Sequence, residues 1–329
     1  MKDTILVLTN SEDGVHSDIV ISKLLQAGET VFRMDSDRLA SGSLQVRFTC
    51  NSESSSFEIR DDSQSVSSGQ IKSIWYRRPD YFNLDIKDPI QKSHAERELA
   101  MLLSGLWSIV PWEATWLSRP AAIEKARKKV LQMKLGRELG LLVPPTIISN
   151  DPSEVTSFYE ENNGKIVFKS IYHEFLDYGT KGFTIPTTII TPLHLSRLDL
   201  VRKLPGMFQK FIAKKYELRV TVVGDQVFAA KISPSETSSF GTVDWRNPKF
   251  VKELKCSSAA EISKEVSDIC LKMMNVLGLG FAAFDFAVDD QDDLYFFEVN
   301  PNGQWYWIES STGMLISDAI VDTLRVKRR

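Results

Sequence analysis

The stretch of residues 281–307 constrains the fold of this chain more than any other. Two short apolar runs, at residues 281–288 and 294–299, flank an acidic segment at residues 289–293. Aromatic and β-branched residues on both sides of turn formers are typical of a β-hairpin. We therefore expect an antiparallel pair of strands here, and its polar residues must follow the two-residue period of a strand.

Three polar side chains, here called the oxygen trio, interrupt this hairpin. Asp285 breaks the first run between Phe284 and Phe286, where an unpaired charge would be costly. Glu298 and Asn300 lie two residues apart at the end of the second run, so alternation places both on one face. Two carboxylates and an amide oxygen form a hard ligand set that suits Mg²⁺. Asp285 could instead be a turn-adjacent acid and Glu298 a solvated strand end, but we favour the metal site.

The composition is that of an ordinary globular protein with room for more than one packed unit. Of the 329 residues, 43% are hydrophobic and 25% are charged, so two or three units are expected. A formal net charge of −3 gives no indication of nucleic-acid binding. The three cysteines are far apart and form neither a metal spacing nor a disulfide framework. No apolar run resembles a signal peptide or a membrane span, so we expect a cytoplasmic protein without membrane or nucleic-acid partners.

Composition shifts divide the chain into three expected segments. A β-α-β pattern at the N-terminus, with strands near residues 4–8 and 30–34, indicates a parallel sheet. Boundaries near residues 117–120 and 205–206 then give domains at residues 1–118, 119–205 and 206–329. Beyond residue 118 the pattern predicts helices at residues 124–139, 153–161, 193–203, 261–277 and 316–324, and strands at residues 165–170, 207–212, 217–223 and 226–232. Residues 171–188 are expected to form a polar hairpin or loop.

Four basic residues precede the oxygen trio and could meet phosphates bound with Mg²⁺. Lys169 and Lys231 each lie within an apolar strand, which is unusual for a lysine without a partner. Lys129, within an Arg-Lys-Lys run, could equally be a surface lysine, and Arg219 is the fourth. Their occurrence on separate strands before the trio favours a phosphate site. The chain has no GxxxxGK[ST] loop and no GxSxG nucleophile turn.

From about residue 119 onward these residues resemble the ATP-grasp carboxylate–amine ligases. Lys129 precedes a Gly-Leu-Leu-Val-Pro-Pro-Thr segment, Lys169 ends a Val-Phe-Lys strand, and the oxygen trio matches the family's metal motif. The resemblance implies an ATP-grasp fold, α/β overall, in which an N-terminal parallel-sheet pre-ATP-grasp domain precedes central and C-terminal α+β subdomains that clasp ATP. It implies ATP and Mg²⁺ as cofactors.

The resemblance also assigns roles to individual residues. It implies ATP-binding roles for Lys129, Lys169, Gln209, Lys210, Phe211, Ile212, Lys231 and Asn300. It implies metal ligation by Asp285, Glu298 and Asn300, and catalytic roles for Arg219, Arg246 and Lys231.

Within that superfamily the chain is most similar to the ligases that mature microviridins and related graspetides. Trp75-Tyr76-Arg77-Arg78 and the aromatic residues after the metal motif carry this similarity. It implies a ribosomal precursor peptide as partner, a homodimer, and a leader-docking helix near residues 192–203, where Leu193-His194 replaces an acidic pair. The implied peptide contacts are Arg77, Arg78, Tyr178, Leu193, His194 and Arg197.

The implied reaction is ATP-dependent activation of an Asp or Glu side chain of the peptide as an acyl phosphate. A Ser or Thr hydroxyl, or a Lys amine, then forms an ω-ester or ω-amide macrocycle. The sequence does not choose between ester and amide. Two alternatives remain open: a ligase that adds amino acids to a small molecule or a protein tail, and a non-catalytic module that binds ATP or a peptide.

Overall fold

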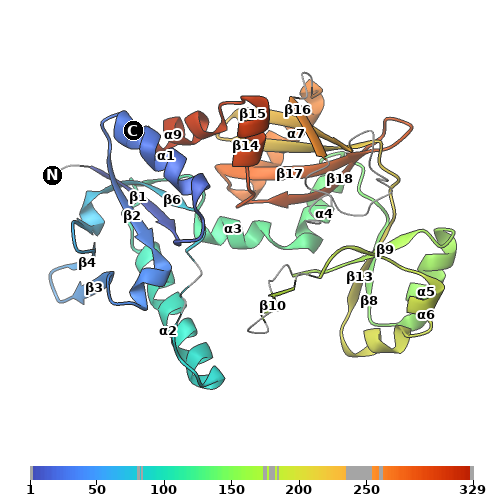
Figure 1. The fold of residues 1–329 in the computed structure, drawn as a ribbon, viewed down its shortest axis with the longest axis horizontal. Helices are drawn as coiled ribbons and strands as arrows, with labels where there is room; N and C mark the ends of the chain where they lie inside the picture. The colour runs from blue at the N-terminus through green and yellow to red at the C-terminus, as the bar shows by residue number, and fades with distance from the viewer. Residues whose placement is uncertain are drawn as a thin grey trace.

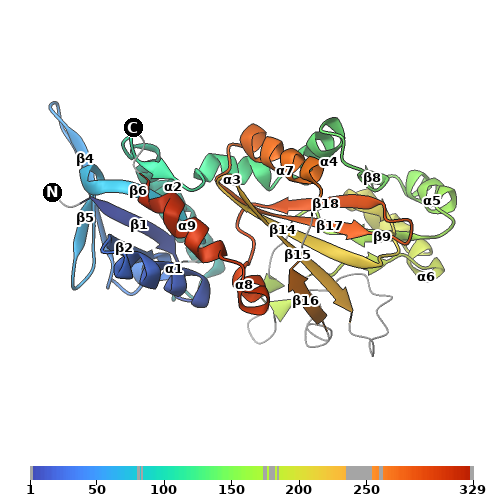
Figure 2. The same ribbon diagram turned by 90° about the horizontal axis from the view of Figure 1, so that it is seen from above.

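The computed structural model describes residues 3–79, 82, 84–172, 176–177, 182–183, 185–234, 254–258 and 262–326. The chain is elongated, with the N-terminal sheet at one end and a smaller sheet with α5 (Pro152–Glu161) and α6 (Pro192–Leu195) at the other (Figures 1 and 2). A larger antiparallel sheet lies between them and carries the hairpin singled out above.

The N-terminal sheet is parallel, as predicted. Its order is β2-β1-β6-β7, formed by β1 (Thr4–Thr9), β2 (Thr30–Asp35), β6 (Ile71–Tyr76) and β7 (Thr115–Trp116). Every residue of β1 is buried, which is the pattern of a strand covered on both faces. Helices α1 (Val15–Gln26) and α2 (Pro89–Ser108) accompany this sheet, and β3 (Gln45–Cys50), β4 (Ser55–Arg60) and β5 (Ser65–Ser67) form a separate antiparallel sheet.

The single helix predicted at residues 124–139 is wrong. Two helices, α3 (Pro120–Ala126) and α4 (Lys129–Glu138), are separated by a break at which Lys128 is extended, with ψ 98°. The buried Gln132 amide explains how the break is tolerated, because its Nε2 donates to the Ala126 carbonyl at 2.6 Å. A helix end is thus satisfied by a side chain instead of by the next turn.

The smaller sheet is antiparallel with the order β12-β9-β13-β8. Its strands are β8 (Thr146–Ser149), β9 (Ile166–Lys169), β12 (Thr188–Ile189) and β13 (Gly206–Lys210), and α5 (Pro152–Glu161) packs against it. Within the segment predicted as a hairpin, β10 (Leu176–Asp177) pairs with β11 (Gly182–Phe183) in antiparallel fashion.

The helix predicted at residues 193–203 is also wrong. It is replaced by a one-turn helix, α6 (Pro192–Leu195), and a 3₁₀ segment, η3 (Leu198–Lys203). The Ser196 hydroxyl donates to the Leu193 carbonyl at 2.8 Å, and such local side-chain bonds compete with helix continuation.

The larger sheet has the order β16-β15-β14-β17-β18. Its strands are β14 (Tyr216–Val223), β15 (Gln226–Pro234), β16 (Leu254–Ser258), β17 (Phe281–Val288) and β18 (Leu294–Asn300). The predicted hairpin is therefore confirmed as β17–β18, whereas β16 and the helix α8 (Tyr306–Thr312) were not predicted. Helix α7 (Lys264–Leu277) covers one face of the sheet through a core that includes Met273, Phe284 and Phe286.

The last helix, α9 (Ile316–Arg325), returns to the N-terminal sheet and lies beside α1 (Figure 1). The Ser73 hydroxyl on β6 donates to the Leu324 carbonyl at 2.6 Å, and Lys23 Nζ lies 2.7 Å from Asp318 Oδ2. One hydrophobic core contains residues of β1, α1, β17 and α9. This core joins the first and the third predicted segments, so packing alone does not separate them. The division at residues 118 and 205 stays a prediction.

Within the described ranges, no helix combines the length and the apolar character that a membrane crossing requires.

The entry into β17 depends on a glycine. A Cβ at Gly280 would lie 1.7 Å from the Leu117 carbonyl oxygen and 2.8 Å from its carbon, and Ser118 Oγ accepts from the Gly280 amide at 3.1 Å. We predict that Gly280→Ala lowers the free energy of unfolding by about 3 kcal/mol or more, because the clash is with backbone. Urea unfolding measures it.

Gly105→Ala is the matched control, since a Cβ at this position inside α2 would meet no heavy atom within 4 Å apart from its chain neighbours and the nearby backbone of the helix itself. Its stability should be unchanged or raised by up to about 1 kcal/mol. Equal stability of the two variants would contradict the role of Gly280.

Candidate active site

The oxygen trio lies on one face of the β17–β18 hairpin, as predicted. Asp285 pairs directly with Glu298, and Ala283 pairs with Asn300. Directly opposed residues of an antiparallel pair point to the same side, so Asn300 follows Glu298 along that face. The sequence alternation by itself would also have placed residue 296 there.

A β-bulge prevents this. Phe286 pairs with Phe296 while Asp285 pairs with Glu298, so Phe297 is the extra residue of β18. Phe296 consequently joins the buried core under α7, whereas Glu298 faces the other way. Bulges re-aim side chains in this manner and are frequent beside functional sites.

Both carboxylates of the trio are held by cations. Asp285 Oδ1 lies 2.6 Å from Arg219 Nη1, and Glu298 Oε2 lies 2.6 Å from Lys129 Nζ. Arg219 occupies the position on β14 directly opposite Asp285, and both of these side chains are almost fully buried. Lys129 comes from the first residue of α4. The structure therefore brings two of the four predicted cations to the trio.

The trio fits Mg²⁺ by the chemistry of its atoms. Its members supply only oxygen ligands, which Mg²⁺ prefers, and the carboxylates already lie where positive charge compensates them. The Asn300 side-chain oxygen accepts the Asn302 amide at 3.0 Å, which fixes its orientation. Across the described part of the chain, no three His, Cys, Asp or Glu residues gather into a metal-binding group, so the amide is needed to complete the set.

Five of the predicted nucleotide residues, Lys169 and residues 209–212, gather between the smaller and the larger sheet. Lys169, at the end of β9, donates from Nζ to Gln209 Oε1 at 2.7 Å and lies 4.2 Å from the Phe297 ring centroid. These residues, with residues 210–212 and Lys214, line a cavity of about 20 Å³. That space is large enough for about one water molecule, whereas ligand pockets usually exceed about 300 Å³. The cavity in this conformation is therefore too small for a nucleotide.

Burial lowers the pKa of Lys169 to about 8, although the nearby Glu298 carboxylate acts in the opposite direction. Lys129 and Lys214 lower the pKa further by repulsion. Lys169 is therefore charged at neutral pH but loses its proton within a mildly alkaline range.

A larger cavity of about 520 Å³ is also lined by residues 210–213. It is bordered by Lys165, Tyr295 and the acidic turn of the hairpin. Residues 210–212 thus line both cavities, and Lys169 lines the smaller of the two.

Lys231 is not brought to the trio. It pairs with Leu218, whose side chain belongs to the core under α7, while Arg219 pairs with Ala230. The Lys231 Nζ atom lies 4.2 Å from the Tyr216 ring centroid. The predicted roles of Lys231 in phosphate binding and catalysis gain no support from this placement. Arg246 lies outside the described residues.

The predicted peptide contacts do not form one group. Arg77 was predicted to contact the peptide; it is 1% exposed and bonded to protein atoms, so its placement gives this prediction no support. Arg78, beside it, is exposed. Leu193 is exposed near α6, where His194 Nδ1 accepts the Thr191 amide as a cap. Arg197 follows α6, and Tyr178 lies outside the described residues.

Two features of the site were missed. Phe297 reaches the site only because of the bulge, and the alternation of apolar and polar residues does not predict a bulge. Lys214 and Glu217 form an ion pair of 2.5 Å with both side chains 6% exposed, and Lys214 Nζ lies 5.9 Å from the Phe297 centroid. The polar Ala-Lys-Lys-Tyr-Glu run carries no apolar pattern that would have predicted this burial.

Two family models match the chain. The MvdD pre-ATP grasp domain matches residues 4–124, and the RimK-like ATP-grasp domain matches residues 126–324.

Solved structures match almost the whole chain. The macrocyclase MdnC bound with precursor peptide MdnA, from Microcystis aeruginosa MRC, has a TM-score of 0.86 and 27% identity, covering 98% of this chain and 99% of that one. A RiPP-associated ATP-grasp ligase of Chryseobacterium gregarium, in complex with ADP and a leader and core peptide, has a TM-score of 0.88 and 26% identity, covering 98% and 96%.

A curated relative matches a smaller part. The ribosomal protein bS6–L-glutamate ligase of Escherichia fergusonii is 25% identical over 209 residues, which is 62% of this chain. The match spans 65% of the length of that relative, and also 65% of a probable alpha-L-glutamate ligase of Pseudomonas fluorescens that is 22% identical.

The pKa of Lys169 predicts the pH dependence of nucleotide binding. Below a pH of about 8 its charge is present and favours phosphate, and above that pH the free protein loses it. We expect ADP affinity to fall as the pH rises from 8 to 9.5, by up to about tenfold per pH unit. Calorimetric titration at each pH measures this.

Lys169→Met is the control, since it removes the charge and keeps the length. It should bind ADP about tenfold or more weakly at pH 7 and show no further loss between pH 8 and 9.5. A wild-type affinity that is constant across this range would contradict the assignment.

Proposed function

The chain belongs to the RimK-like ATP-grasp family, and from this premise we propose that it is an ATP-dependent ligase that forms macrocycles in a ribosomal precursor peptide. Family membership comes from the match over residues 126–324. ATP-grasp ligases use ATP and Mg²⁺, and the site described above contains oxygen ligands for the metal and basic residues for the phosphates.

The observation that carries the peptide substrate is the closeness of the structural match. The peptide-bound macrocyclase MdnC aligns with 98% of this chain, including the N-terminal sheet, at 27% identity and a TM-score of 0.86. The N-terminal part also matches the MvdD pre-ATP grasp domain. An enzyme that shares both parts with peptide macrocyclases is most simply a ligase for the same class of substrate.

The proposed reaction has two steps. The γ-phosphoryl group of ATP passes to a side-chain carboxylate of the peptide, giving an acyl phosphate and ADP. A Ser or Thr hydroxyl, or a Lys amine, then attacks the acyl carbon, loses its proton, and phosphate leaves. Each link therefore removes the elements of one water from the peptide and consumes one ATP.

The chain's own residues would supply positioning and charge. Asp285, Glu298 and Asn300 would hold Mg²⁺, which neutralises charge on the phosphates when it is bound. Lys129, Lys169 and Arg219 would bind phosphate oxygens, in a buried setting where such contacts are strong. One well-placed donor of this kind is typically worth roughly 3 kcal/mol in the transition state. Arg246 remains a sequence-based candidate for the same task.

We also propose that exposed residues at both ends of the chain contact the peptide and that the protein forms a homodimer. Arg78 is exposed beside the end of β6, and Leu193 and Arg197 lie at the far end of the smaller sheet. A precursor with a separate leader and core could contact both regions.

A second candidate is a ligase that adds free amino acids, because the curated relatives are glutamate ligases. It differs in a measurable way, since ADP release would then depend on a free amino acid and require no peptide. A screen of amino acids against a candidate precursor peptide separates the two.

We predict that the wild-type chain, with ATP and Mg²⁺, shifts a precursor peptide by one water mass per link. Glu298→Gln should lower the rate by about 100-fold or more, because it removes one carboxylate of the proposed metal site. Mass spectrometry of the peptide over time measures both, and thermal unfolding verifies that the variant is folded.

Asp292→Asn is the matched control. It neutralises an acid on the same hairpin, in the turn, where it pairs with the exposed Lys215. Its rate should equal that of the wild type. Full activity of Glu298→Gln, or equal loss in both variants, would refute the metal assignment, and ADP release that depends only on a free amino acid would refute the peptide substrate.

A further inference from the structure

Arg77 is a buried cation that none of the proposed steps uses. It directly follows β6, at the carboxyl edge of the parallel sheet, and is 1% exposed. Burial lowers the pKa of its guanidinium to about 10, so it remains charged at neutral pH. A buried charge is costly unless it is paired and bonded, and its partners therefore indicate what it does.

The partners of Arg77 lie in a different part of the fold. Its Nη1 donates to the Asn302 carbonyl at 2.7 Å and to the Gly303 carbonyl at 3.2 Å. These two residues belong to the 301–304 loop, which directly follows the oxygen trio at the end of β18. One side chain thus connects the N-terminal sheet to the segment that leaves the site.

The 301–304 loop itself holds two members of the site. The backbone N–H of Asn302 donates to the side-chain oxygen of Asn300 at 3.0 Å. The Gln304 carbonyl accepts from Arg219 Nη2 at 3.2 Å, while Arg219 Nη1 contacts Asp285. Arg77 is therefore linked through Asn302 to the proposed metal ligand Asn300. Through the backbone of the same loop it is linked to the Arg219–Asp285 pair.

The loop lies close against Arg219. A Cβ at Gly303 would lie 2.5 Å from Arg219 Nη2 and 2.6 Å from the Ala283 Cβ. A glycine is therefore needed for this close approach of the loop to Arg219 and β17. The bonds that hold the two loop carbonyls thus also bear on the position of Arg219.

A carboxylate in turn holds Arg77. Asp13 Oδ1 lies 3.2 Å from Arg77 Nε, and each of the two side chains is 1% exposed. The neighbouring His16 is not a second cation for the Asp13 carboxylate, because burial lowers the pKa of His16 to about 4 and leaves the ring neutral at pH 7. Asp13 and His16 come from the loop before α1 and from its first turn, so the N-terminal domain supplies the whole support.

We infer that Arg77 is a positioning residue, through which the N-terminal domain holds the 301–304 loop so that Asn300 and Arg219 are oriented for the metal–nucleotide complex. The inference rests on the proposed metal site and not on the identity of the acceptor substrate. If Arg77 only stabilised the domain interface, its loss would lower the free energy of unfolding, because Asp13 would be left buried and unpaired, and it would change ADP binding equally with and without Mg²⁺.

The test compares ADP binding with and without Mg²⁺, by calorimetry on the full chain. Arg77→Met should weaken binding in Mg²⁺ by about tenfold or more, as expected for losing charged hydrogen bonds, and change binding in EDTA by less than about twofold. Arg77→Lys keeps the charge and one donor and should lie between wild type and Met.

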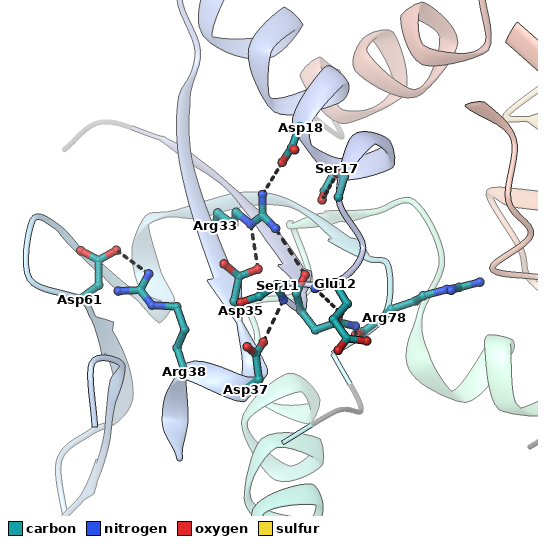
Figure 3. Close-up of polar contacts among 12 residues, drawn as sticks. Ser11, Glu12, Ser17, Asp18, Arg33, Asp35, Asp37, Arg38, Asp61 and Arg78 are labelled. Carbon is teal, nitrogen blue, oxygen red and sulfur yellow. Dashed lines mark hydrogen bonds and ion pairs between the residues drawn. The ribbon is translucent and has the colours of Figure 1, made fainter. Parts of the chain in front are cut away.

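Arg33→Met is the matched control at the same edge of the sheet. Figure 3 shows Arg33 between Asp18 and Asp35, with its Nη2 donating to the Asn10 carbonyl at 3.3 Å. None of these bonds reaches the 301–304 loop. The variant should lower the unfolding temperature and leave the ratio of the two ADP affinities at its wild-type value.

An Arg77→Met protein with a wild-type ratio of affinities would overturn the inference, as would the same change of ratio in Arg33→Met. If Arg77→Met does not unfold cooperatively, Asp13→Asn decides by the same ratio, with an expected loss of about threefold confined to Mg²⁺. The peptide assay is separate: a wild-type chain with Mg²⁺-dependent ADP binding and an unmodified peptide would contradict the proposed function and leave this inference standing.

Discussion

The buried pair of Arg219 and Asp285 is the interaction on which the rest of the site depends. Both side chains lie on the central strands of the larger sheet and are almost without solvent. Removing one partner of such a pair leaves an uncompensated charge and typically costs about 3–5 kcal/mol. The pair therefore fixes the face of the sheet on which the charged side chains of the site lie. The 301–304 loop, Lys129 and Glu298 are arranged around it.

An exchange of ionic partners explains how the site can be stable without ligands and still bind them. Glu298 with Lys129, and Asp285 with Arg219, are charges that a metal cation and phosphate anions would compensate equally well. Lys169 is similarly held by Gln209 beside the ring of Phe297. The small cavity at this position is lined by residues of both the smaller and the larger sheet.

The N-terminal domain is joined to this site by more than a linker. Helix α9 brings the end of the chain back to α1, and one core contains residues from both ends. Arg77 adds a polar connection across the same boundary. This arrangement gives the N-terminal domain a physical route to the metal ligands, which is consistent with its presence throughout the peptide macrocyclases that match the chain.

The sequence by itself determined the parallel N-terminal sheet, the β17–β18 hairpin and the common face of the oxygen trio, because apolar alternation and turn residues are local. It also indicated the family through the spacing of lysines before the trio. The break between α3 and α4, the bulge at Phe297, the burial of Arg77 and the placement of Lys231 away from the trio were decided by the tertiary structure. Each depends on partners distant in sequence, such as Gln132 for Ala126 and Asn302 for Arg77, and no local pattern encodes which of two faces such a partner will occupy.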